Sequence, residues 1–91
     1  MPKYVIERTV PGVGSMSAAE LQALAAKSNA VIEDVGPGVQ WVHSYVTPDK
    51  LFCVYNATDA EIILEHARCG GFPVDEVTPV ATVIDPVTGE S

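Results

Sequence analysis

Two helix-start signals constrain the fold of this chain more than any other feature. Ser17-Ala18-Ala19-Glu20 and Thr58-Asp59-Ala60-Glu61 both match the capping box, in which a hydroxyl at the helix start and an acidic side chain three residues later satisfy each other's backbone amides. Apolar residues at helical spacing follow each signal. Glycines end both stretches, at Gly36 and at Gly70-Gly71. The sequence therefore predicts two helices between these limits.

Stretches that alternate between apolar and polar residues surround the helices and predict strands. One lies before the first helix, two lie between the helices and one follows the second, covering residues 4–9, 39–46, 51–55 and 77–84. The two central stretches flank Thr47-Pro48-Asp49-Lys50, which predicts a hairpin.

The order strand, helix, strand, strand, helix, strand is that of the split βαβ, or ferredoxin-like, fold. We therefore expect the α+β class: a ferredoxin-like βαββαβ domain with a four-stranded antiparallel sheet, two helices on one face and the other face open. With 91 residues and 47% hydrophobic content the chain can bury one core, so residues 1–91 should form a single domain with a tail at about 85–91. A domain this small gains by burying an open sheet face against a copy of itself, which predicts a homodimer.

Composition argues against several classes of partner. The net charge is −7 and the chain has only 5 Lys and Arg, so we expect neither nucleic acid nor an anionic membrane as a partner. No stretch has the roughly 20 apolar residues that a bilayer requires or the pattern of a secretion signal. Its 2 cysteines lack the C-x-x-C spacing, so we expect free thiols in a cytoplasmic protein.

The open sheet face is where we expect a binding site, and the hairpin register decides which side chains it holds. If Thr47 pairs with Lys50, one face carries Trp41, His43, Tyr45, Phe52 and Val54. The opposite face then carries Val42, Ser44, Val46, Leu51, Cys53 and Tyr55. A slip of one residue would instead bring His43 beside Tyr55 and Tyr45 beside Cys53. An open-face histidine suits a base or a ligand donor, whereas an aromatic stripe also suits a dimer contact.

Glu7 and Arg8 are neighbours on the first strand, which we expect to be central in the sheet. Alternation sends one of them to the open face and the other toward the helices. A charge at the centre of a sheet requires a partner, so it belongs either to a structural ion pair or to the polar anchor of a pocket. The candidate ligand-binding residues are therefore Glu7, Arg8, Trp41, His43, Tyr45 and Tyr55.

The remaining candidates are possible metal donors. His66 lies on the inward stripe near the end of the second helix, where an imidazolium meets the helix dipole and bonds a free carbonyl, which favours a structural role. Cys53 fits the place of a small buried hydrophobic residue. Imidazole and thiolate together suit Ni(II), Zn(II) or Cu, so the candidate metal ligands are His43, Cys53 and His66.

Six segments together resemble one family, and the resemblance covers nearly the whole chain. They are Tyr4-Val5-Ile6-Glu7-Arg8, Trp41-Val42-His43-Ser44-Tyr45-Val46, Phe52-Cys53-Val54-Tyr55, Glu65-His66-Ala67-Arg68, Gly71-Phe72-Pro73 and Val83-Ile84-Asp85-Pro86. The chain is similar to small bacterial ferredoxin-like proteins catalogued as a domain of unknown function, one branch of which is nickel-binding. For the nickel-binding branch, the resemblance implies histidines near the end of the first strand and in a Gly-His-Pro turn around the close of the second helix. Here those places hold Arg8 or Thr9 and Phe72.

The sequence therefore predicts a cytoplasmic homodimer whose open sheet face binds a small ligand or metal, with nickel as the candidate cofactor and without evident catalysis. Two alternatives remain. In a metal-handling protein, His43, His66 or Cys53 would meet at a subunit interface. In an enzyme of the dimeric α+β barrel type, His43 or Tyr55 would move a proton on an aromatic or quinone-like substrate.

Overall fold

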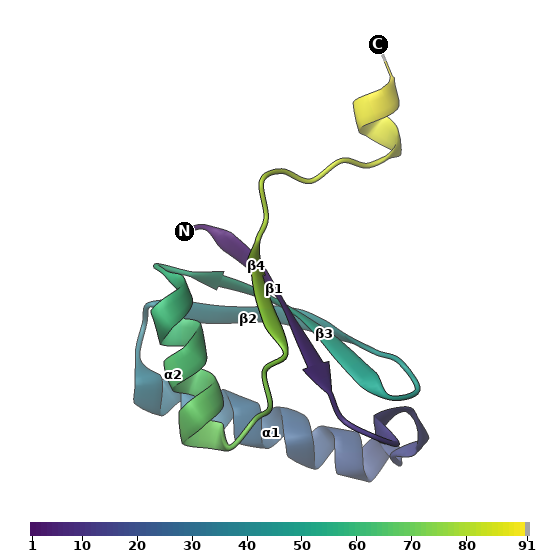
Figure 1. Cartoon of the computed structure of the whole chain (residues 1–91), viewed down its shortest axis with the longest axis vertical. Coiled ribbons are helices and arrows are strands. Elements are labelled where there is room, and N and C mark those ends of the chain that lie inside the picture. The colour runs from purple at the N-terminus through teal and green to yellow at the C-terminus, as the bar shows by residue number, and fades with distance from the viewer. Residues whose placement is uncertain (91) are drawn as a thin grey trace.

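The computed structural model describes residues 1–90, and its elements follow the predicted order. They are β1 (Lys3–Thr9), α1 (Ala18–Val35), β2 (Val39–Val46), β3 (Lys50–Ala57), α2 (Ala60–Gly70) and β4 (Glu76–Pro79), with short 3-10 turns η1 (Val13–Ser15) and η2 (Pro86–Gly89) (Figure 1). The strands form one antiparallel sheet in the order β2-β3-β1-β4. The fold is therefore the expected ferredoxin-like α+β fold.

The first helix begins as predicted, whereas the second begins one residue later. Ser17 Oγ accepts from the amide of Glu20 at 3.1 Å, and Glu20 Oε1 accepts from the amide of Ser17 at 2.9 Å. In α2 the carboxylate of Asp59 caps the amide of Ile62 at 3.0 Å. Thr58 lies before the helix, where its backbone amide donates to the carbonyl oxygen of Gly38, the residue before β2. The predicted capping role of Thr58 is therefore wrong.

Two glycines let the chain turn back under the sheet after α2. Gly71 has φ +68, the left-handed conformation that favours glycine at a helix end. At Gly70, a Cβ would lie only 2.2 Å from the ring of Phe72, so a side chain there would displace the ring from this position. The amide of Phe72 donates to the carbonyl oxygen of Ala67 at 2.8 Å. This return places Phe72 and Pro73 beneath β1.

A β-bulge in the hairpin changes the predicted register at one end. Thr47 and Lys50 close the turn as expected, and from His43 onward the predicted faces are confirmed, with His43 opposite Val54. Val42 is the extra residue of the bulge, because Trp41 pairs with Tyr55 and the next pair is His43 with Val54. Trp41 therefore lies on the same face as Tyr55, toward the helices, and its predicted place on the open face is wrong.

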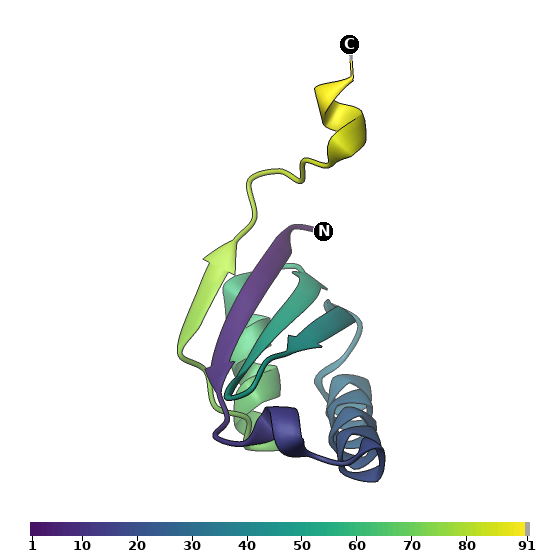
Figure 2. The same ribbon diagram turned by 90° about the vertical axis from the view of Figure 1, so that its right-hand side faces the viewer.

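The last strand is shorter than the stretch 77–84 predicted for it. Its pairing with β1 ends at Tyr4 and Pro79, and one further bond joins the amide of Val80 to the carbonyl oxygen of Lys3. Residues 81–90 leave the domain (Figures 1 and 2), and the Ile84 side chain is 76% exposed.

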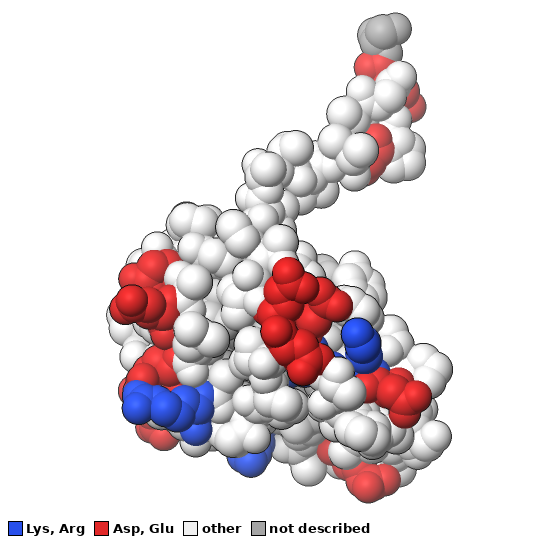
Figure 3. Space-filling view, viewed as in Figure 1, with Lys and Arg blue, Asp and Glu red and all other residues white. Residues whose placement is uncertain are grey.

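The core lies between one sheet face and the two helices (Figure 2). Alternation along each strand supplies it with apolar side chains, and its fully buried members include Ile6 and Ile63. On the face seen in Figure 3, acidic side chains are spread over the surface and basic ones occur in small separate groups. Within residues 1–90, no helix combines the length and apolar character that crossing a membrane would need.

Candidate binding pocket between the sheet and the helices

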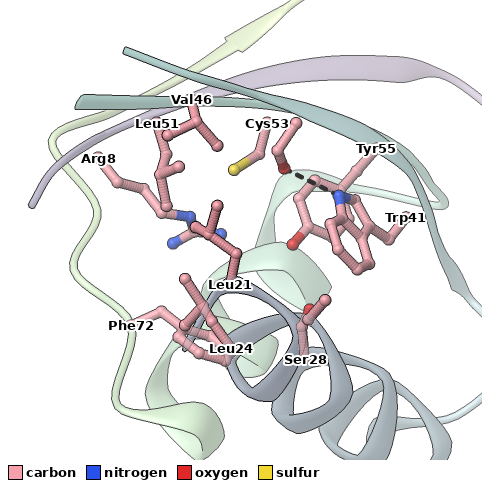
Figure 4. A pocket seen from close by; sticks show the side chains of 12 residues that line it. Arg8, Leu21, Leu24, Ser28, Trp41, Val46, Leu51, Cys53, Tyr55 and Phe72 are labelled. Atoms are coloured by element: carbon pink, nitrogen blue, oxygen red, sulfur yellow. Dashed lines mark hydrogen bonds between the residues drawn. The ribbon is translucent and has the colours of Figure 1, made fainter. Parts of the chain in front are cut away.

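A cavity of about 170 Å³ lies between the helix-facing side of the sheet and α1. Its wall is largely apolar and is formed by Leu21, Leu24, Ala25, Trp41, Val46, Leu51 and Phe72 (Figure 4). Its polar side chains are Arg8, Ser28, Ser44, Cys53 and Tyr55. An apolar hollow with a few convergent polar groups is the usual form of a small-molecule site.

Arg8 is the charged group of this pocket and is only 3% exposed. It faces the helices because it pairs with Leu51 on β3 and alternates with Glu7, which faces the other way. Its Nη1 donates to the carbonyl oxygen of Pro73 at 2.7 Å, and the guanidinium carbon lies 5.7 Å from the centre of the Phe72 ring. Among residues 1–90, no side chain or backbone group accepts a hydrogen bond from Nη2, which is fully buried.

No carboxylate neutralises this guanidinium within the described chain. The ion pairs formed by residues 1–90 join Lys50 to Glu7 and Arg68 to Glu65. A buried charge without a counter-charge is costly, so the sequence alternative of a structural ion pair at Arg8 does not apply. The alternative that fits the geometry is the polar anchor of a pocket.

Tyr55 and Cys53 enter the same pocket from β3. In Figure 4 the Arg8 guanidinium, the Tyr55 hydroxyl and the Cys53 thiol all point into the hollow. Burial raises the pKa of Tyr55, and the positive charge of Arg8 opposes this only in part. The hydroxyl therefore stays protonated at neutral pH and can donate a hydrogen bond. Cys53 is a buried free thiol, as expected.

Trp41 closes one side of the pocket and is held there by the bulge. Its Nε1 donates to Ser44 Oγ at 2.9 Å (Figure 4). Sequence reasoning missed Ser44 and Ser28 as pocket residues. For Ser28 a signal was present, since a serine within the apolar stripe of α1 has to face the interior.

The six predicted ligand-binding residues divide between two faces of the sheet. Arg8, Trp41 and Tyr55 line the pocket. Glu7, His43 and Tyr45 lie on the opposite face, where the rings of His43 and Tyr45 meet edge to face with centres 5.0 Å apart. The sheet itself separates the two groups, so these six residues do not form one site.

The predicted metal donors are also separated. His43 lies exposed on the open face, whereas Cys53 and His66 are buried on the helix side. Within residues 1–90, no three histidine, cysteine, aspartate or glutamate side chains are grouped closely enough to hold a metal ion.

His66 lies at the centre of the interface between α1, α2 and β3, and it is completely buried. Its Nε2 lies 3.3 Å from the carbonyl oxygen of Ser28, to which it donates, and Nδ1 is buried without a partner among the described residues. The rings of Tyr55 and Phe72 lie 5.5 and 5.3 Å away. Burial lowers the pKa of His66, and the bond to the Ser28 backbone opposes this only in part. This environment fits the structural role expected for His66. The ring differs from the expectation in two ways: it is neutral rather than an imidazolium, and it bonds a carbonyl of α1 rather than one at the end of its own helix.

We expect His66→Ala to lower the free energy of unfolding by about 1–3 kcal/mol, because it removes ring packing and a buried hydrogen bond. The wild-type stability should also depend on pH. An unfolded histidine has a pKa of about 6.5, and burial lowers the folded value, so the unfolded chain binds more protons in acid. The contribution of neutral His66 is complete above about pH 6.5 and is lost as the pH falls toward the lower folded pKa.

Urea unfolding at about pH 8 and about pH 5.5 measures this effect. His66→Gln should flatten the pH dependence, whereas His43→Gln, on the exposed face, should leave it unchanged. An equal pH dependence in wild type and His66→Gln would contradict the assignment.

Comparison with known proteins agrees with this fold. A model of the family described as "Nickel responsive protein SCO4226-like" matches residues 4–80. The crystal structure of SCO4226 from Streptomyces coelicolor A3(2) superposes with a TM-score of 0.75 at 16% identity, covering 90% of this chain and 99% of that one. None of the curated proteins compared with the chain matches its sequence. The resemblance noted from the sequence is confirmed, and the chain belongs to the SCO4226-like family of nickel responsive proteins.

Proposed function

We propose that this chain is a cytoplasmic, homodimeric binding protein that holds one small, largely apolar molecule in the pocket between the sheet and α1. The observation that supports this best is the apolar cavity into which Arg8 and Tyr55 direct polar atoms. The binding site is thus on the helix side of the sheet and not on the open face. The free thiols of Cys53 and Cys69 are consistent with a reducing compartment.

Binding is favoured over the enzyme alternative by the placement of the proton-transfer candidates. His43 and Tyr55 lie on opposite faces of the sheet, so they do not act on one substrate. Tyr55 alone is a poor base, since burial raises its pKa and keeps it protonated. Its role in this proposal is to donate a hydrogen bond to the ligand.

A substitution that fills the pocket tests this proposal. Ala25 lines the cavity from α1, and Ala26 beside it is exposed, so Ala25→Phe should abolish binding while Ala26→Phe should not. The probes are single-ring aromatic compounds, neutral and charged: toluene, benzamide and benzoate. Trp41 is the one tryptophan of the chain and lines the pocket, so its fluorescence reports saturable binding.

Circular dichroism would check that both variants are folded. If no probe gives saturable binding to the wild type, or if Ala25→Phe binds as well as Ala26→Phe, the pocket is not the binding site.

The open face supports the proposed dimer. Val5, Phe52 and Val54 are half-buried there, and Tyr45, beside Phe52, is 60% exposed. Apolar side chains gathered on one exposed face of a small domain commonly form an interaction surface, and a copy of the same face can cover them. The exposed Val83 and Ile84 add apolar surface in the segment that leaves the domain.

We therefore expect light scattering to give twice the 9.6 kDa mass of one chain. Tyr45→Lys should shift the protein toward monomer, because it places a charge in the apolar patch. Leu64→Lys is the matched control, since Leu64 is an exposed apolar residue on α2, away from this face. A monomeric wild type would refute the dimer, and equal effects of the two variants would place the interface elsewhere.

Nickel is the second candidate, and only the family description favours it. The donors present do not fit a metal centre, since His43 is separated from Cys53 and His66 by the sheet. The two places where the resemblance implies histidines hold Arg8 or Thr9 and Phe72, and the structure brings Arg8 against the Phe72 ring. A guanidinium is always charged and has no lone pair to offer a metal.

We expect calorimetric titration of untagged protein with Ni(II) to show no stoichiometric site tighter than micromolar. Zn(II) should behave in the same way. A tight site that is lost in His43→Ala or His66→Ala would overturn this expectation and favour the metal-handling function.

A further inference from the structure

We propose that the ligand of this pocket carries a carboxylate on a small aromatic or aliphatic body, and that the carboxylate pairs with Arg8 and Tyr55. This inference rests on the proposed binding function and names the chemical class of the ligand.

The first step is the charge of the pocket. Arg8 is the one Lys, Arg, His, Asp or Glu side chain among the lining residues; the other polar members are Ser28, Ser44, Cys53 and Tyr55, and burial keeps the Tyr55 hydroxyl protonated. His66, whose ring centre lies 5.3 Å from that of Phe72, does not line the pocket and is also neutral. The pocket thus carries one positive charge, and no acidic side chain of its own balances it.

The second step is the free hydrogen-bonding capacity of that charge. Nη1 is used by the carbonyl oxygen of Pro73, whereas Nη2 is buried and has no acceptor among residues 1–90. An unused donor on a buried guanidinium costs more than one on a neutral group. A neutral acceptor such as an amide oxygen would satisfy the donor only, while an anionic oxygen satisfies both the donor and the charge.

The third step is the second donor. The Tyr55 hydroxyl and the Arg8 guanidinium both point into the hollow (Figure 4), and both can donate to an anion. Two donors match the two oxygens of a carboxylate. A phosphate monoester has more charge and more acceptors than this pair can satisfy inside apolar walls, so a carboxylate is the better match.

The fourth step is size. A cavity of about 150 Å³ lined by apolar residues holds one benzene molecule. The present cavity of about 170 Å³ is therefore large enough for a single ring or a short branched chain. Leu21, Leu24 and Leu51 would contact this apolar body, and the carboxylate would face Arg8.

Benzoate and benzamide form the matched probe pair, because they have the same ring and differ in charge. At neutral pH we expect wild type to bind benzoate roughly ten- to hundredfold more tightly than benzamide, the range of a charge-assisted hydrogen bond. Arg8→Gln should remove this preference, and Arg68→Gln, which alters an exposed arginine, should keep it. Phenyl phosphate should bind more weakly than benzoate.

Arg8→Gln also loses the bond to Pro73, so a second variant guards against misfolding. Tyr55→Phe keeps the ring and removes only the hydroxyl, and it should weaken benzoate several-fold while leaving benzamide affinity closer to its wild-type value. Fluorescence of Trp41 and the rise in melting temperature with added probe measure each affinity.

The outcomes separate this inference from the proposed function. If benzamide binds as tightly as benzoate, or if folded Arg8→Gln keeps the preference, the ligand is neutral and only the carboxylate assignment falls. Phenyl phosphate binding more tightly than benzoate would likewise replace the carboxylate by a phosphate. If none of the probes binds wild type, both the inference and the binding function are overturned.

Discussion

The burial of Arg8 on the helix side of the sheet is the constraint on which the rest of this structure depends. A guanidinium at the centre of a small core has to be held by groups that reach it, and the chain supplies them from the segment after α2. The Pro73 carbonyl accepts from it, and the Phe72 ring lies against it. Gly70 leaves room for the Phe72 ring in its observed place, and Gly71 adopts the left-handed conformation that turns this segment back beneath β1. The end of α2, the Phe72 wall of the pocket and the buried charge of Arg8 therefore depend on the same contacts.

The pocket-lining rings of Tyr55 and Phe72 both contact the ring of His66. His66 lies between Tyr55 and Phe72, with Nε2 bound to the backbone of α1. Because burial keeps this ring neutral, the cluster adds no second positive charge next to Arg8. His66, a candidate metal donor by sequence, thus fits better as a neutral side chain that packs in the core. The Arg8 guanidinium then sets the charge of the pocket.

Much of the fold could be predicted from sequence because it depends on local signals. The Ser17 cap, the glycines after α2 and the turn at Thr47 are each set by a few neighbouring residues. The length of β4 could not be predicted, since it depends on long-range pairing with β1, which stops at Tyr4 and Pro79. The sequence also left open which of Glu7 and Arg8 faces inward. Alternation requires them to differ, and only packing against the helices selects the member that is buried.

One inserted residue decides where the candidate site lies. Without the bulge at Val42, strict alternation would put Trp41 beside His43 and Tyr45, and the open face would hold every aromatic residue of β2. With the bulge, Trp41 turns toward the helices and its indole bonds Ser44, so it becomes a wall of the pocket. His43 and Tyr45 remain on the other face, available to a partner. β2 is an edge strand, and its alternate residues contribute to the two faces of the sheet. Because of the bulge, Trp41 joins the pocket on the helix side, while the open face keeps His43 and Tyr45 as a candidate interface.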